Sequence, residues 1–221
     1  EIPIIGDGDS GYGNAVNVKR TVRGYARAGF AAVMIEDQVS PKRCGHTRGN
    51  SVVSRGEAVG RIQAAVDARE EGADILRRLG MQVAGAGDVL GVIPPSHRFD
   101  IAIEQDLMEE IGRSYARGPD GLEEALWRAV AFSDAGADLL FVEAPTSRDE
   151  MREICRRVPG HHLANMLEEG LTPICSEPEL EDMGFKLVAH PFALLGPSIL
   201  AMKRALAALK EGRAAEETIS F

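Results

Sequence analysis

Short apolar runs alternate with segments of helical spacing along most of this chain. Runs of apolar and β-branched residues predict strands, and apolar residues repeated every three or four positions predict amphipathic helices. The predicted strands are Ile2–Gly6, Phe30–Ile35, Leu139–Val142, Leu163–Met166 and Lys186–His190. The predicted helices are Asn17–Ala28, Ser54–Glu71, Leu122–Phe132, Arg148–Val158, Pro178–Met183 and Pro197–Lys210. This alternation predicts an α/β fold with a parallel sheet.

A helix, a glycine, an apolar residue and a strand follow one another at four places, namely Gly29, Gly72, Gly136 and Gly184. The interval between the second and third of these junctions is too long for one helix and one strand. Within it, Ala73–Leu76 begins a strand that runs into two arginines, Pro94 and Pro95 break the pattern, and Phe99–Ile111 has helical spacing. We therefore predict a single domain over residues 1–212, with an irregular insertion or replaced segment at 77–120, and a tail over 213–221.

Carboxylates follow the predicted strands. Asp7 and Asp9 come after the first, Glu36 ends the second, and Glu143 follows Leu139–Val142. The C-terminal edge of a parallel sheet is where barrels and open sheets carry their sites. No G-x-G-x-x-G string follows a strand and no P-loop occurs, which favours a barrel over a nucleotide-binding sheet. Asp7 and Asp9 alone also suit a turn, but together with Glu36 they suit a hard cation such as Mg²⁺.

The loop after the second strand gathers Lys42, Arg43, Cys44 and His46 around Gly45. A thiol beside two cations and an imidazole should have its thiolate favoured, so it can exchange a proton near neutral pH. A lone cysteine is more often an inert core residue, but these charged neighbours are unsuited to a core. Cys44 is therefore the candidate catalytic thiol, and the other two cysteines are predicted to be structural.

The 221 residues carry a net charge of -9. An acidic surface argues against nucleic acid or an anionic membrane as a partner, and the apolar runs are too short to span a bilayer. Three widely spaced cysteines form no disulfide framework, which favours a reducing compartment. Because Glu1 directly precedes a strand and no initiator methionine is present, we expect that an N-terminal part has been lost or removed.

Three strings, in this order and spacing, resemble the isocitrate lyase and phosphoenolpyruvate mutase superfamily. They are Asp-Gly-Asp-Ser-Gly-Tyr-Gly-Asn (7–14), Ile-Glu-Asp-Gln (35–38) and Pro-Lys-Arg-Cys-Gly-His (41–46). Further matches are Phe-Val-Glu-Ala-Pro (141–145), Leu-Ala-Asn-Met-Leu-Glu (163–168) and Gly-Phe-Lys-Leu-Val (184–188). The resemblance covers residues 1–76 and 121–212. Residues 6–49 are most similar to plant and algal plastid members labelled carboxyvinyl-carboxyphosphonate phosphorylmutase, which implies a chloroplast location; apart from this resemblance, a cytoplasmic location is expected.

The resemblance implies a (β/α)8 TIM-type barrel, a homo-oligomer (tetramer or dimer) that exchanges C-terminal helices, one Mg²⁺ and a small anionic carboxylate substrate. By position it implies that Asp7, Asp9 and Glu36 lie around the metal, partly through water. It also implies a mobile catalytic loop and a set of substrate-binding residues. The loop residues are Lys42, Arg43, Cys44 and His46, and the substrate-binding residues are Gly45, His46, Glu143 and Asn165.

Two departures from the family pattern lead us to expect an incomplete barrel. Two β/α units would precede residue 1, and the family's Ala-Arg-Thr-Asp string on the fifth strand is missing. In the corresponding place the chain reads Asp-Ile-Leu-Arg-Arg-Leu-Gly (74–80), so we expect a disrupted fifth strand.

Three functional hypotheses follow. The first is a Mg²⁺-dependent lyase that cleaves a carbon–carbon bond of a 2-hydroxy or 2-oxo dicarboxylic acid through an enolate, with Cys44 as the general acid. The second is a phosphorylmutase that forms a phosphorus–carbon bond. The third is an inactive family member that acts through subunit association alone. Activity on a panel of 2-hydroxy diacids and phosphonates distinguishes them.

Overall fold

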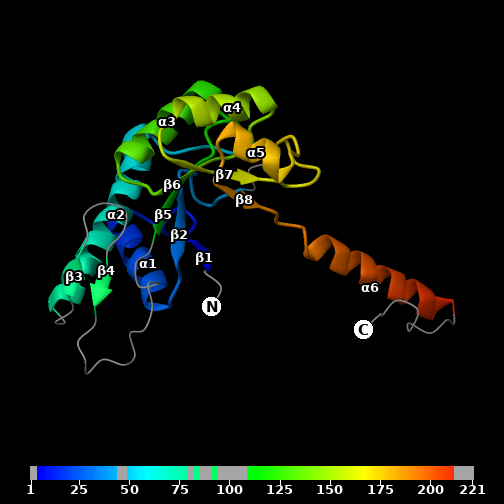
Figure 1. Cartoon of the computed structure of the whole chain (residues 1–221), viewed down its shortest axis with the longest axis horizontal. Helices are drawn as coiled ribbons and strands as arrows, with labels where there is room; N and C mark the ends of the chain where they lie inside the picture. The colour runs from blue at the N-terminus through cyan, green and yellow to red at the C-terminus, as the bar shows by residue number, and fades with distance from the viewer. Residues whose placement is uncertain (1–3, 44–48, 79–81, 85–90, 94–108, 212–221) are drawn as a thin grey trace.

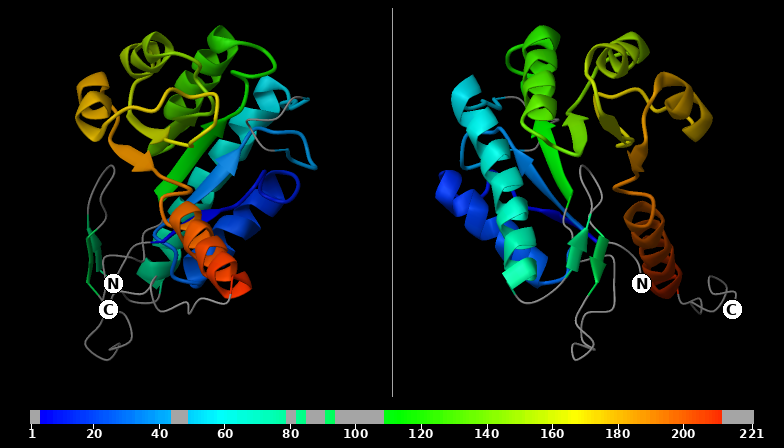
Figure 2. Two further views of the ribbon diagram at one scale, coloured as in Figure 1. Left: turned by 90° about the vertical axis from the view of Figure 1, so that its right-hand side faces the viewer. Right: turned by 60° about the vertical axis from the view of Figure 1, so that its left-hand side comes forward.

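A computed structural model describes residues 4–43, 49–78, 82–84, 91–93 and 109–211. In these residues, six strands form one all-parallel sheet in the order β1-β2-β5-β6-β7-β8. The strands are β1 Ile5–Asp7, β2 Ala32–Glu36, β5 Glu109–Ser114, β6 Leu139–Val142, β7 His161–Asn165 and β8 Leu187–Ala189. The sheet is curled, and helices cover its outer face (Figures 1 and 2). The predicted α/β fold with a parallel sheet is confirmed.

The helices are α1 Ala15–Arg27, α2 Arg55–Arg78, α3 Leu122–Asp134, α4 Arg148–Arg157, α5 Glu177–Met183 and α6 Leu195–Lys210. Their ends follow local capping chemistry. The Asn14 side chain accepts hydrogen bonds from the first backbone amides of α1, and Ser147 does the same for α4. Ser176 and Glu179 form a capping box on α5, and Gly184 ends that helix in the left-handed conformation.

Alternate residues of each strand face the two sides of the sheet. Val33, Ile35, Leu140 and Val142 belong to the core that the sheet shares with α1, α2, α3 and α4. Their neighbours in the sequence, among them Phe141, face the opposite, inner side in a small cluster. That cluster consists of Ala32, Leu139, Phe141 and Leu163, with Met34 and Ala189 packed against it.

The segment 77–120 contains a regular strand of the main sheet. β5 pairs in parallel with β2 on one side and with β6 on the other, so the fifth strand expected to be disrupted is present. Glu109–Ile111, expected at the end of a helix, lies in this strand. Ala73–Leu76, expected to begin a strand, lies inside α2, which continues past Gly72 to Arg78. Pairing with β2 and β6 holds β5 in the sheet. The sequence did not predict this strand, because its residues lack a regular apolar pattern.

A second, two-stranded sheet lies in the same segment. β3 (Gln82–Ala84) and β4 (Gly91–Ile93) pair antiparallel, apart from the main sheet and near the end of α2 (Figures 1 and 2). The segment predicted to be an irregular insertion therefore contains this separate pair of strands as well as β5 of the main sheet. Residues 99–108 of the predicted helix lie outside the described residues.

α6 stands away from the rest of the molecule (Figure 1). Several of its large apolar side chains are exposed: Leu195, Ile199, Leu200, Met202, Leu206 and Leu209. Within the part of the chain that the structure describes, no helix is both long and apolar enough to cross a membrane.

Candidate active site

Three carboxylates meet where β1 and β2 end. The two strands pair in parallel, and the loop after β1 continues beside β2, where the Glu36 amide donates to the Asp9 carbonyl at 2.9 Å. Gly8 permits this approach, because a Cβ at that position would lie 2.9 Å from Ile35 and from Val33. The predicted convergence of Asp7, Asp9 and Glu36 is therefore present in the structure.

The Lys42 ammonium lies among these carboxylates. Its Nζ is 3.0 Å from Asp7 Oδ2, forms an ion pair with Asp9 Oδ1, and lies 3.8 Å from Glu36 Oε2. Burial disfavours the charged amine, but hydrogen bonds to Asp9 and Asp7 outweigh it, so the pKa of Lys42 is raised. Lys42 is therefore a fixed cation that connects the loop after β2 to the sheet edge.

Arg113, near the end of β5, is a second cation of the site. Its guanidinium forms an ion pair with Glu143 Oε2, and its Nη1 lies 4.0 Å from Glu36 Oε2. The same group lies over the Phe141 ring at 4.4 Å and the Tyr115 ring at 4.5 Å. Stacking and ion pairing fix the planar group on the inner face of the sheet.

Glu36 lies between the two cations with its side chain 1 % exposed. Burial raises the pKa of Glu36 to about 7, although Lys42 and Arg113 act in the opposite direction. Its Oε2 is buried and has no hydrogen-bond partner among the described residues. A buried carboxylate oxygen without a donor suits a group that enters the site, such as a water molecule or a cation.

Asp37 connects the ends of β2 and β5 on the opposite side from Glu36. Its buried carboxylate accepts hydrogen bonds from Ser114 Oγ and the Tyr115 amide, each at 2.8 Å, and from Arg128 Nη1 at 3.4 Å. Since Ser114 and Tyr115 directly follow Arg113, this network fixes the part of the chain that carries the arginine.

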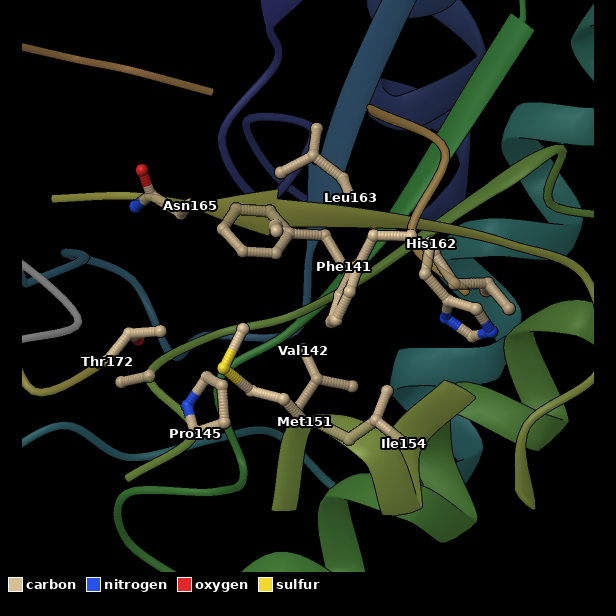
Figure 3. A pocket seen from close by; sticks show the side chains of 13 residues that line it. Phe141, Val142, Pro145, Met151, Ile154, His162, Leu163, Asn165 and Thr172 are labelled. Atoms are coloured by element: carbon tan, nitrogen blue, oxygen red, sulfur yellow. The ribbon is translucent and has the colours of Figure 1, made fainter. Parts of the chain in front are cut away.

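Two of the four residues predicted for substrate binding, Glu143 and Asn165, lie among the described residues. Glu143 directly follows β6 and contacts Arg113, as described above. Asn165 ends β7 on the same face as Leu163, and its amide points away from Met151 and Ile154, which line the pocket of Figure 3 with His162. Cys44, Gly45 and His46 lie outside the described residues.

The donor chemistry of Asp7, Asp9 and Glu36 fits Mg²⁺, which prefers carboxylate oxygens and keeps several waters. The buried Glu36 oxygen without a donor is consistent with that use. Among the described residues, no group of three or more His, Cys, Asp and Glu side chains is arranged to hold a metal ion. In the present arrangement the three carboxylates bind the Lys42 ammonium.

Sequence reasoning missed Arg113, Asp37 and Gln38 as functional candidates. Arg113 was hidden because β5 reads Glu-Glu-Ile-Gly-Arg-Ser, without the apolar run of a buried strand. The resemblance expects an arginine on the fifth strand, but the sequence pattern placed that strand at residues 74–80 and not at β5. Asp37 and Gln38 belong to the Ile-Glu-Asp-Gln motif, but the motif does not indicate that Asp37 binds Ser114, Tyr115 and Arg128, or that Gln38 binds Glu36 and Arg43.

An all-parallel curled sheet with cations and carboxylates at its C-terminal edge identifies an α/β barrel-type fold, in which that edge carries the functional site. The family model described as phosphoenolpyruvate phosphomutase matches residues 1–78 and 98–210. The chain belongs to this family, within the isocitrate lyase and phosphoenolpyruvate mutase superfamily, and the predicted resemblance is confirmed. A shorter match, to the tRNA synthetase B5 domain, spans residues 60–116 and covers too little of the chain to assign a family.

Three relatives show where the chain lies in this superfamily. It is 39% identical to 2,3-dimethylmalate lyase of Eubacterium barkeri, over 95% of this chain and 61% of the relative. It is 38% identical to a chloroplastic carboxyvinyl-carboxyphosphonate phosphorylmutase of Arabidopsis thaliana, over 95% of this chain and 53% of the relative. It is also 38% identical to 2-methylisocitrate lyase of Aeropyrum pernix, over 95% of this chain and 56% of the relative.

Solved structures agree with these relatives. A crystal structure of 2,3-dimethylmalate lyase superposes with a TM-score of 0.75 at 38% identity, covering 95% of this chain and 59% of that chain. Oxaloacetate acetylhydrolase in complex with 3,3-difluorooxalacetate gives a TM-score of 0.76 at 33% identity, covering 96% and 61%. The chain thus spans little more than half the length of these relatives.

Proposed function

We propose that this protein is a Mg²⁺-dependent lyase that cleaves a carbon–carbon bond of a 2-hydroxy or 2-oxo dicarboxylic acid through an enolate. The observation that carries the proposal is the pair of cations, Lys42 and Arg113, on either side of the buried Glu36 carboxylate. The names of the lyase relatives and of oxaloacetate acetylhydrolase support the substrate class, since they refer to small 2-hydroxy or 2-oxo polycarboxylic acids.

Arg113 is the proposed group for a substrate carboxylate. Its planar guanidinium can donate two parallel hydrogen bonds to a carboxylate, and its contacts with Phe141 and Tyr115 keep it in place. Glu143, directly after β6, and Asn165, at the end of β7, would lie beside the same substrate carboxylate. Gly45 and His46 would hold the carboxylate from the loop side.

Mg²⁺ bound by Asp7, Asp9 and Glu36, partly through water, would polarise the substrate oxygen and supply positive charge. Lys42 would add a second positive charge close to the oxygen that becomes negative as the carbon–carbon bond breaks. With Arg43 and His46, it belongs to the loop that excludes water from the reaction. Cys44 Sγ would deliver the proton to the enolate carbon, and Cys44→Ser tests this step because a hydroxyl is far less acidic.

The experiment is a panel assay of the purified chain with Mg²⁺ or with EDTA. The panel contains 2,3-dimethylmalate, 2-methylisocitrate, oxaloacetate and phosphoenolpyruvate. A lyase releases a 2-oxo acid from a 2-hydroxy diacid with Mg²⁺ and none with EDTA. Absence of carbon–carbon cleavage throughout the panel would reject the proposal.

The phosphorylmutase function remains the alternative, favoured by the relative from Arabidopsis thaliana and by the description of the matching family. Conversion of phosphoenolpyruvate with retention of phosphorus, followed by ³¹P spectroscopy, would support it. A chain without either activity that still forms oligomers would match the third hypothesis, an inactive family member.

We further propose that the protein is a homo-oligomer that exchanges α6 between subunits. The exposed apolar side chains of α6, which stands away from the sheet, support this proposal. A chloroplast location remains a prediction, since one relative is described as chloroplastic and others are bacterial or archaeal proteins.

A further inference from the structure

Gln38 is a buried amide that belongs to none of the predicted functional sets. Its residue is 1 % exposed, and its side chain bonds to the backbone of Arg43, five residues ahead. Its Oε1 accepts from the Arg43 amide at 3.1 Å, and its Nε2 donates to the Arg43 carbonyl at 2.8 Å. A side-chain amide that bonds both backbone groups of one residue fixes the position and the direction of the chain there.

The same amide reaches the catalytic edge. Its Nε2 also lies 3.3 Å from Glu36 Oε1 and donates to that carboxylate. One side chain therefore connects a buried carboxylate of the proposed metal site to the loop that supplies Lys42. A glutamate of the same shape would lack both N–H donors and would place a carboxylate against two oxygen acceptors.

The backbone of Gln38 is itself held firmly. Nη1 of the buried Arg61 donates to the carbonyls of Glu36 at 3.2 Å and Gln38 at 3.0 Å. Gln38 also forms an antiparallel bridge with Val52, and the Val39 amide donates to the Ser51 carbonyl at 3.0 Å. The two ends of the loop are thus joined at its base, and the Gln38 side chain adds a third fixed point at Arg43.

We propose that Gln38 is a positioning residue, which holds the Arg43 backbone so that the neighbouring Lys42 ammonium stays among Asp7, Asp9 and Glu36. Gln38 touches no reacting atom and acts through Lys42. The catalytic part of this inference rests on the proposed lyase function, but the placement of Lys42 is a property of the chain that can be measured without substrate.

The test compares the chain with its Gln38→Met and Gln38→Glu variants, by brief acetylation of lysines and mass spectrometry. An amine held by several carboxylates is acylated slowly, so both variants should label Lys42 at least about fivefold faster. Lys19, which forms a 3.0 Å ion pair with Asp67, is the internal control in the same sample and should label at an unchanged rate. A matched variant is Gln63→Met, which removes a donor to the Asp67 carboxylate on an exposed helix face and should leave the labelling of Lys42 unchanged.

Two further measurements separate positioning from general loss of structure. Thermal unfolding followed by circular dichroism should show that the Gln38 variants are folded and unfold cooperatively. Hydrogen exchange of the Arg43 amide should be at least about tenfold faster in these variants than in the wild type. Unchanged labelling of Lys42 and unchanged exchange at Arg43 would overturn the proposal. Equal acceleration at Lys19 would do the same, since it would indicate global loosening.

The effect of Gln38 on catalysis is measured separately, by steady-state kinetics. If the chain cleaves a member of the substrate panel, the Gln38 variants should lose at least about tenfold in kcat with a smaller change in KM. Faster Lys42 labelling with unchanged kcat would overturn the link between position and catalysis. If the chain cleaves no member of the panel, the proposed function fails, while the labelling and exchange results still decide the position of Lys42.

Discussion

At the scale of single residues, the site is defined by cations that contact several carboxylates at once. Arg113 lies between Glu143 and Glu36, and Lys42 lies between Glu36 and the two aspartates. Each cation reduces the cost of burying Glu36, and under the proposed function each would become available to an anionic substrate that displaces a carboxylate. The residues therefore form a charge network in which one change affects several partners.

Arg113→Lys should reduce kcat/KM by at least about a hundredfold, because an ammonium cannot reproduce the planar, stacked and two-pronged contact of a guanidinium. The measurement is steady-state kinetics on whichever panel substrate the chain accepts. Arg117→Lys is the control, since Arg117 binds Glu150 at 2.7 Å, away from the inner face. Wild-type kinetics for Arg113→Lys would remove Arg113 from the substrate site.

His162 provides a pH prediction away from the site. It is buried, its Nε2 lies 3.0 Å from the Val158 carbonyl, and burial lowers its pKa below the ordinary value of 6.5. The unfolded chain then binds more protons than the folded chain as the pH falls through 6.5. Stability from this group is therefore present above pH 6.5 and is lost below it.

Urea unfolding between pH 7.5 and pH 5 measures this effect. His162→Gln should show a weaker loss of stability on acidification than the wild type. His161→Gln, at the exposed neighbouring position on β7, should follow the wild type. Identical pH dependence in all three proteins would contradict the assignment.

At the scale of elements, the strand ends position the site, and some of them were predictable. β2 was predictable because an apolar run ends in Glu36 and Asp37, and β6 because its run ends in Glu143. β5 was not, because its pairing with β2 and β6 holds a polar segment in the sheet. α2 passes through Gly72 and continues to Arg78, so the glycine that was expected to end this helix does not end it.

Gly8→Ala tests how closely the loop after β1 approaches β2. The added methyl group would meet Ile35, Val33 and the Met34 carbonyl at about 3 Å, so the loop must move away. We expect a loss of about 1–3 kcal/mol of stability by chemical denaturation, together with faster acetylation of Lys42 as its carboxylates shift.

Gly24→Ala is the matched control in the interior of α1, where an added Cβ meets nothing within 4 Å. It should be neutral or stabilise the protein by up to about 1 kcal/mol. Equal stability of the two variants would show that the loop does not need glycine at position 8.

At the scale of the whole molecule, α6 is the feature that the isolated chain leaves unexplained. Leu206 and Leu209 are 66% and 58% exposed, and α6 stands away from the sheet (Figure 1). Apolar surface of this extent on one helix is expected to be covered in an assembly. The sequence predicted the helix and its amphipathic character, but only the structure shows that the sheet does not cover it.

Leu206→Glu should reduce the molar mass measured by light scattering toward that of a single chain. Lys203→Glu, on the same helix and also exposed, is the control for added negative charge and should leave the assembly intact. A wild-type protein that is monomeric at every concentration would contradict helix exchange.

The central claim is tested most directly by following the reaction in D₂O by ¹H NMR, with Mg²⁺ and 2,3-dimethylmalate or 2-methylisocitrate. For either 2-hydroxy acid, the account predicts a 2-oxo acid and a second carboxylic acid with a single deuterium at the carbon released as the enolate, and neither product in EDTA. Carbon–carbon cleavage without deuterium at that carbon, or intact substrates after prolonged incubation with Mg²⁺, would contradict it.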